Sequence, residues 1–204
     1  MTNNLFLTPF MGLDNFVGNI HTLLGDFWFL ILYNAFGLIA VALRVTEFQL
    51  KSRAKRYVVS IGSYIAWIFY FFLQNGYTTA LVSFVCAVQC LIFLQREKHK
   101  WAKSIVWLIL FLAIHLTISF MALDSWRAIF SISAGVFATI GYFVISEKYY
   151  RIIMICSLSS WVLSSAFNLY IVALCSDCTS TVSAIIGLIR YYHYRKDETQ
   201  KSIK

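Results

Sequence analysis

Seven apolar runs, each bounded by polar or basic residues, constrain this chain more than any other feature of its sequence. They cover residues 27–46, 57–74, 77–95, 104–122, 126–146, 152–174 and 179–194. A helix needs roughly 17–25 mostly apolar residues to cross the hydrocarbon core of a bilayer. Because 60% of the chain is hydrophobic, the residues left over are too few for a second soluble domain. We therefore predict an all-α integral membrane protein with seven transmembrane helices.

The basic residues alternate with uncharged turns along this pattern. Most of the 17 Lys and Arg residues lie in Lys51–Arg56, Arg96–Lys103, Lys148–Arg151 and the tail from Arg195 to Lys204. Basic loops remain in the cytoplasm, so we expect an external N-terminus and a cytoplasmic C-terminus, with 195–204 as a cytoplasmic tail. Such clusters attract anionic lipid, and the net charge of +8 therefore indicates membrane topology and lipid contact, with no nucleic acid as partner.

Residues 1–26 form a different kind of segment. They contain no Lys or Arg, so no signal peptide is expected. Thr8 and Pro9 suit the start of a helix. The apolar side chains that would then share one helical face are Phe10, Leu13, Val17, Ile20 and Leu24. We expect a short amphipathic helix on the outer leaflet, or a longer first span.

Two of the apolar runs carry the same polar and aromatic stripe. RYVVSIGSYIAWIFYFFLQ (56–74) aligns with YRIIMICSLSSWVLSSAFN (150–168), so that Trp67 matches Trp161 and Gln74 matches Asn168, 94 positions further on. Positions i, i+3, i+4 and i+7 share a helix face. The alignment predicts two parallel three-helix repeats, 27–95 and 126–194, joined by a linker helix at 104–122, a 3+1+3 arrangement.

The stretch NLYIVALCSDCTSTVSAIIGLIRYYHYRK (168–196) ends an apolar helix in Ile189-Arg190, followed by aromatic and basic residues. Here, and more loosely over 30–196, the chain resembles the small bacterial inner-membrane proteins typified by YgjV. Its predicted 3+1+3 arrangement also resembles the SWEET sugar transporters and the PnuC vitamin transporters. These resemblances imply a bacterial inner (plasma) membrane and alternating access between repeats. Pro9 is the only proline, so the proline hinge of SWEET transporters is not expected.

The polar residues within the spans are the candidate ligands of a solute. Trp67 and Trp161 could stack on a flat or sugar-like molecule, and Gln74 and Asn168 could bind its polar edge. The other candidates, on the same faces or midway along other spans, are Tyr70, Ser164, Asn34 and Gln89. The alternative is that all of them pack and form hydrogen bonds between helices, as polar residues in membranes commonly do.

Arg44, Glu47 and Arg190 lie about one turn from the predicted cytoplasmic boundary. Their side chains could snorkel to water, or could form a cytoplasmic gate in which Glu47 pairs with an arginine. No carboxylate is expected deep inside a span, so a proton-coupled pump of the buried Asp/Glu type is not expected. His115, in the linker helix, is expected to form a hydrogen bond between helices, with a proton relay as the alternative.

Cys175 and Cys178 are expected in the external turn between the last two spans, as free thiols, as a disulfide or, with Asp177, as a weak metal site. The chain contains no enzyme signature, and no cofactor is expected. We favour a small transporter that lets an uncharged or zwitterionic solute diffuse across the membrane by alternating access. A non-transporting scaffold or accessory subunit is the alternative, and either could form a homodimer.

Overall fold

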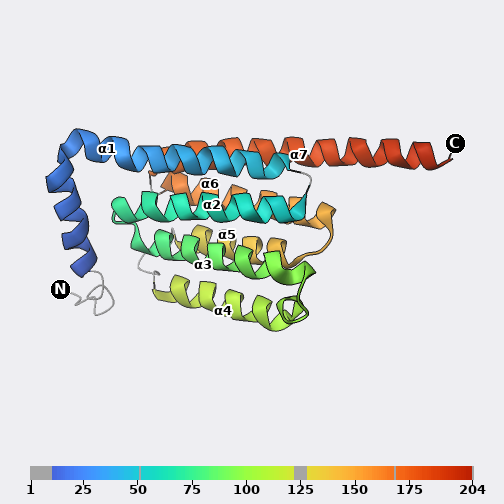
Figure 1. Cartoon of the computed structure of the whole chain (residues 1–204), viewed down its shortest axis with the longest axis horizontal. Coiled ribbons are helices and arrows are strands. Elements are labelled where there is room, and N and C mark those ends of the chain that lie inside the picture. The colour runs from blue at the N-terminus through green and yellow to red at the C-terminus, as the bar shows by residue number, and fades with distance from the viewer. Residues whose placement is uncertain (1–10, 51, 122–127, 168, 204) are drawn as a thin grey trace.

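A computed structural model describes residues 11–50, 52–121, 128–167 and 169–203, and every regular element in these ranges is helical. The helices run back and forth in sequence order (Figure 1). They are α1 (Met11–Gln49), α2 (Arg53–Leu73), α3 (Tyr77–Leu94), α4 (Ile105–Met121), α5 (Ala128–Phe143), α6 (Glu147–Phe167) and α7 (Ile171–Ile203). Two short 3-10 helices, η2 (Gln95–Glu97) and η3 (Trp101–Lys103), connect α3 to α4.

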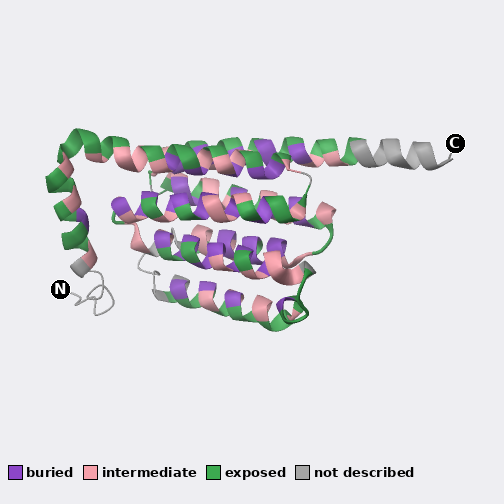
Figure 2. Cartoon of the chain, in the orientation of Figure 1, coloured by how far each residue is buried: buried purple, intermediate pink, exposed green. Residues whose placement is uncertain are grey.

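The surface of the bundle has the character of a protein in lipid. Large apolar side chains point outward, among them Leu38, Val106 and Phe120, which are 67%, 64% and 71% exposed. The interior instead contains many buried polar side chains, and buried and exposed residues alternate around each helix (Figure 2). By length and composition, α1, α2, α6 and α7 can cross a membrane, whereas α3, α4 and α5 hold shorter apolar stretches.

The helices pack in two groups of three. In one group α2 contacts both α1 and α3, and in the other α6 contacts both α5 and α7. Contacts of α1 with α7 and of α3 with α5 join the groups, while α4 packs against α5 and α3 at the edge of the bundle (Figure 1). The chain therefore offers one long boundary between two similar groups, and this boundary holds the candidate site.

Helix α1 changes direction at Gly25, whose backbone angles (φ 72°, ψ 162°) are not helical. The part before this glycine turns away from the bundle axis as an arm (Figure 1). Within the arm Val17 is buried, and the Asp14 carboxylate accepts a hydrogen bond of 2.7 Å from the Tyr77 hydroxyl at the start of α3. Of the residues predicted to start this segment, Thr8, Pro9 and Phe10 lie outside the described residues.

The predicted boundary between the last two spans was wrong. Helix α6 ends at Phe167 and α7 already begins at Ile171, eight residues before the predicted start at 179. Leu169 adopts a left-handed conformation (φ 58°), and the Tyr170 amide bonds to the Ser165 carbonyl at 3.1 Å, a pattern that ends helices. Because glycine usually takes that position, a leucine at 169 does not indicate that the helix ends there. The predicted external turn at 175–178 is therefore a turn of α7, and Cys175 and Cys178 are exposed free thiols.

We predict that Gly187→Ala destabilises the contact between α7 and the other group of helices. A Cβ atom at Gly187 would lie 2.8 Å from the Phe48 carbonyl oxygen and 2.5 Å from Nη1 of Arg151. Overpacking of this kind costs about 1–3 kcal/mol of unfolding free energy, which a lower midpoint of unfolding in detergent would reveal. Gly18→Ala is the matched control, because a Cβ there meets no atom within 4 Å. Equal midpoints for both variants would contradict this packing.

Candidate functional site

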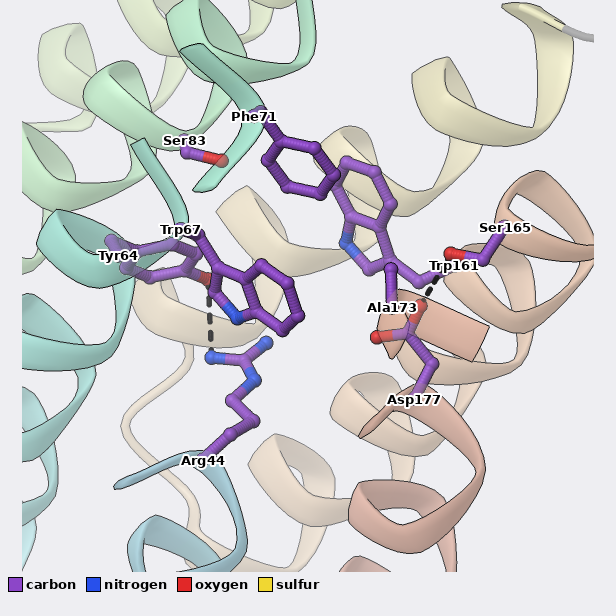
Figure 3. Close-up of a pocket in the computed structure, with 9 residues that line it drawn as sticks. All are labelled: Arg44, Tyr64, Trp67, Phe71, Ser83, Trp161, Ser165, Ala173 and Asp177. Atoms are coloured by element: carbon purple, nitrogen blue, oxygen red, sulfur yellow. Dashed lines mark hydrogen bonds between the residues drawn. The ribbon is translucent and has the colours of Figure 1, made fainter. Parts of the chain in front are cut away.

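A small cavity of about 30 Å³ lies between the two groups of helices. Side chains from α1, α2, α3, α6 and α7 surround it (Figure 3). The lining residues are Arg44, Tyr64, Trp67, Phe71, Ser83, Trp161, Ser165, Ala173 and Asp177. A water molecule needs roughly 10–15 Å³ of such space, so the cavity as it stands has room for about one or two waters.

Trp67 and Trp161, the two tryptophans matched in the sequence, both line this cavity. Trp67 is buried, and its ring stacks on Phe71 with the centroids 5.2 Å apart. Figure 3 shows the Trp67 indole next to the Arg44 guanidinium, and the Trp161 side chain on the side of Ser165 and Asp177. The stripe on α2 and the stripe on α6 therefore face a common space, although 94 positions separate the two tryptophans in the sequence.

Arg44 is the centre of a buried hydrogen-bond network. Its Nη1 lies 3.0 Å from the Glu47 carboxylate, 3.3 Å from the Tyr64 hydroxyl and 3.4 Å from the Tyr142 hydroxyl. Tyr150 donates to the other oxygen of Glu47 at 3.1 Å. Arg44 and Glu47 are only 5% and 0% exposed, so Arg44 does not snorkel to the surface. The network links α1 and α2 to α5 and α6.

Asp177 is the charged lining residue that the sequence did not place in the site, because it was assigned to an external turn. In the structure its Oδ2 accepts a hydrogen bond of 2.7 Å from the Ser165 hydroxyl. Ala173 and Asp177 are four residues apart on α7 and share its cavity-facing side. The offset of 94 positions was one available signal, because it matches Asp177 to Ser83. Ser83 also lines the cavity. Asp177 thus lies within the candidate span Ile171–His193 and not in an external turn.

Three other candidate ligands, Tyr70, Ser164 and Gln74, do not line the cavity. Tyr70 is buried beside Trp67, at a centroid distance of 5.1 Å. Ser164 shares a hydrogen bond of 2.6 Å with Ser131 of α5. Gln74 is half-buried at the C-terminal end of α2, and Asn168, its match in the alignment, lies outside the described residues.

Gln89 and Asn34 are held by neighbouring groups of the protein. The Gln89 amide nitrogen lies 3.1 Å from Nε2 of His115 and donates to the Thr139 hydroxyl at 2.9 Å, which ties α3, α4 and α5 together. His115 therefore forms the expected hydrogen bond between helices. Asn34 is half-buried and donates to the Leu30 carbonyl of its own helix at 2.8 Å.

Ionic contacts close one end of the bundle, where α1, α3, α5 end and α2, α6 begin, and we call this the basic end. Arg56 of α2 binds Glu147 of α6 through two hydrogen bonds, of 2.8 and 2.5 Å. Arg151 adds a bond of 2.8 Å to Glu147 and one of 3.3 Å to the Phe48 carbonyl. Arg190 is exposed and donates to the Gln49 side chain at 2.8 Å, a position that allows it to reach water.

The end away from these ions is closed by aromatic packing. Phe71 of α2 meets the Tyr170 ring, next to the start of α7, with centroids 5.8 Å apart. Gly37 of α1 allows a close approach of Tyr70 and Val172, whose side-chain atoms would lie 3.0 Å from a Cβ there. The cavity therefore lies between an ionic layer and an aromatic layer. Within the described residues, no group of three His, Cys, Asp or Glu side chains could hold a metal ion.

A comparison with known proteins identifies the family. A model of the Imp-YgjV family, described as bacterial inner membrane protein, matches residues 31–195. No curated protein and no solved structure matches the chain. The match covers all of α2 to α6, the second half of α1 and most of α7, including every residue that lines the cavity. The chain belongs to the Imp-YgjV family of bacterial inner membrane proteins.

Proposed function

We propose that the chain is a small transporter that moves an uncharged or zwitterionic solute by alternating access. In this proposal α1–α3 and α5–α7 are two parallel repeats that α4 joins, all seven helices cross the membrane, and the basic end faces the cytoplasm. The observation that carries the proposal is the composition of the cavity wall. Three pairs of lining residues are each 94 positions apart, namely Trp67 and Trp161, Phe71 and Ser165, and Ser83 and Asp177.

Hydrogen bonds within the two groups of helices support the repeat. Ser63 of α2 donates to the Ala40 carbonyl of α1 at 3.1 Å. At the corresponding positions Ser157 of α6 donates to the Ala134 carbonyl of α5 at 2.8 Å. Donor and acceptor are each shifted by 94 positions. The first two helices of each group are thus joined by the same contact.

The ends of α2 and α6 support the same relation. Asn75 and Leu169 both have φ 58° and are the positive-φ residues other than glycine in the described chain. In each case the next amide bonds to the carbonyl five residues earlier, at 2.8 Å for Gly76 and 3.1 Å for Tyr170. A left-handed conformation is uncommon outside glycine, so its recurrence at matched positions is strong support for a duplicated unit.

Contacts between the two groups are exchanged in the way that a twofold axis requires. Arg96, after α3, donates to the Phe143 carbonyl at the end of α5, and Arg190 of α7 donates to the Gln49 side chain at the end of α1. Arg96 matches Arg190, and Gln49 matches Phe143, at the same offset. Pockets of about 430 and 420 Å³ adjoin the two arginines. Parallel repeats related by an axis along the membrane normal are a common design of small transporters.

The size of the cavity supports a closed state. Pockets that bind small molecules usually measure roughly 300–1,000 Å³, whereas this cavity measures about 30 Å³. A solute could enter only if the two groups separate at one end. Separation at the basic end would break the bonds between Arg56 and Glu147, and separation at the other end would part Phe71 from Tyr170.

The proposal predicts that thiol reagents reach the cavity from both sides of the membrane. In a variant without the 5 native cysteines, single cysteines would replace Ser83 or Ser165, which line the cavity. A charged, membrane-impermeant methanethiosulfonate is then applied to right-side-out and to inside-out vesicles. We expect labelling of both positions in both preparations, because alternating access exposes the site to each side in turn.

Matched controls are cysteines at Ser63 of α2 and Ser157 of α6, which are buried in the bundle but do not line the cavity. These should stay unlabelled, whereas a cysteine retained at the exposed position Cys175 should react. If the cavity positions resist the reagent from both sides while Cys175 reacts, the bundle is dry inside. That outcome would contradict transport and favour the scaffold or accessory subunit.

We further predict that Glu147→Gln shifts the equilibrium toward opening at the basic end. The substitution removes the charge that holds Arg56 and Arg151, and Glu147 is 28% exposed, so we expect a loss of about 1–3 kcal/mol after allowance for solvent screening. Labelling of Ser165→Cys should become faster in inside-out vesicles and slower in right-side-out vesicles. Lys55→Gln, at an exposed position of the same end, should leave both rates unchanged. A uniform change in both preparations would speak against a gate.

A further inference from the structure

Asp177 is a half-buried carboxylate that faces the cavity, and it lacks a cationic partner. Glu47 pairs with Arg44, and Glu147 pairs with Arg56 and Arg151. No Lys, Arg or His nitrogen of the described residues lies within 4 Å of the Asp177 carboxylate, and its hydrogen bond comes from the neutral Ser165 hydroxyl.

The surroundings of Asp177 do not supply the missing positive charge. Arg44 faces the same cavity, but Glu47 already balances its charge at 3.0 Å. Counting Arg44, Glu47 and Asp177 alone, one negative charge is left over. Arg56 and Arg151 share the single carboxylate of Glu147 and do not line the cavity. An isolated carboxylate away from water is costly, so a cationic occupant of the cavity would be strongly favoured.

The other walls of the cavity suit an organic cation better than a metal ion. Trp67 and Trp161 line it together with Asp177, and the faces of indole rings attract ammonium groups. Ser83 and Ser165 add two hydroxyl oxygens, which is fewer than a hard metal ion requires with a single carboxylate. The cavity also has the size of one or two waters, and an ammonium ion is close to water in size.

We propose that this cavity binds a compact monovalent cation, either free ammonium or the ammonium headgroup of a larger solute. The N–H groups would donate to the Asp177 carboxylate, and the positive charge would lie against Trp67 and Trp161. This inference rests on the proposed function where it narrows the zwitterionic solute to one that carries an ammonium group. The binding site itself requires no transport.

The test is the thermal unfolding of the full chain in lipid nanodiscs, titrated with methylammonium chloride. Sodium chloride at equal ionic strength controls for screening, and methanol is the neutral probe of similar shape. A ligand that binds the folded state raises the midpoint in a saturable way. We expect this rise with methylammonium alone. Asp177→Asn should increase the half-saturating concentration at least about tenfold, the usual effect of a lost charged hydrogen bond.

The apo forms provide an internal check on folding. Asp177→Asn should unfold at the same or a higher temperature without ligand, because it removes an unbalanced charge and keeps an acceptor for Ser165. Asp26→Asn, at a side chain 94% exposed, should titrate like the native chain. Should Asp177→Asn fail to fold, Trp161→Leu decides the matter, since loss of one indole should weaken binding at least about twofold.

Three results would overturn the inference. The first is an equal response to methylammonium and sodium, and the second is a folded Asp177→Asn variant that titrates like the native chain. The third is stabilisation by acid without any response to methylammonium, which would make a proton the occupant opposite Arg44.

Binding of methylammonium but not of butylammonium would indicate the free ion, and binding of both would indicate a headgroup. Cation binding without thiol labelling from both sides would reject transport and retain the site.

Discussion

The buried contact between Arg44 and Glu47 is the interaction on which the centre of this bundle depends. A guanidinium inside an apolar bundle is tolerated only with a counter-charge and hydrogen bonds, and the carboxylate at 3.0 Å provides the charge. Tyr64 and Tyr142 share a hydrogen bond of 2.8 Å and both contact Arg44, while Tyr150 donates to Glu47. Because these tyrosines come from different groups of helices, satisfying one ion pair also fixes how the two groups meet.

The cavity borders on this network, and the asymmetry of the cavity wall matters for the proposed function. Trp67 and Trp161 provide similar walls on both sides of the proposed twofold axis, but Asp177 stands where the matched residue is Ser83. A duplicated unit supplies two similar halves of the cavity wall. A few residues that differ between the halves give the wall a net charge and make it asymmetric. On this view Arg44 organises the closed state of the bundle, and Asp177 provides the recognition of a solute.

The sequence predicted the membrane class, the helical fold and the pairing of the tryptophans, because lipid requires long apolar helices and identities recur at a fixed offset. The pairing of Arg44 with Glu47 was one of two predictions for these side chains, and snorkelling to water was the other. The pairing could be predicted because residues i and i+3 share a helix face. Asp177 was missed because the start of α7 depends on the left-handed backbone conformation of Leu169. A leucine in the sequence does not predict that conformation. The contacts of Tyr142 and Tyr150 with the network come from the packing of distant helices, which periodicity along one helix does not encode.

The central claim, that two matched groups of helices rock about the cavity, is tested most directly by distances between spin labels in nanodiscs. One pair of labels replaces Lys55 and Tyr149 at the basic end, and the other replaces Phe69 and Leu163 toward the opposite end. All four side chains are exposed, and both pairs are 94 positions apart. The account predicts two populated distances for each pair, with Glu147→Gln lengthening the first distance and shortening the second. A single narrow distance for both pairs, unchanged by Glu147→Gln, would contradict it.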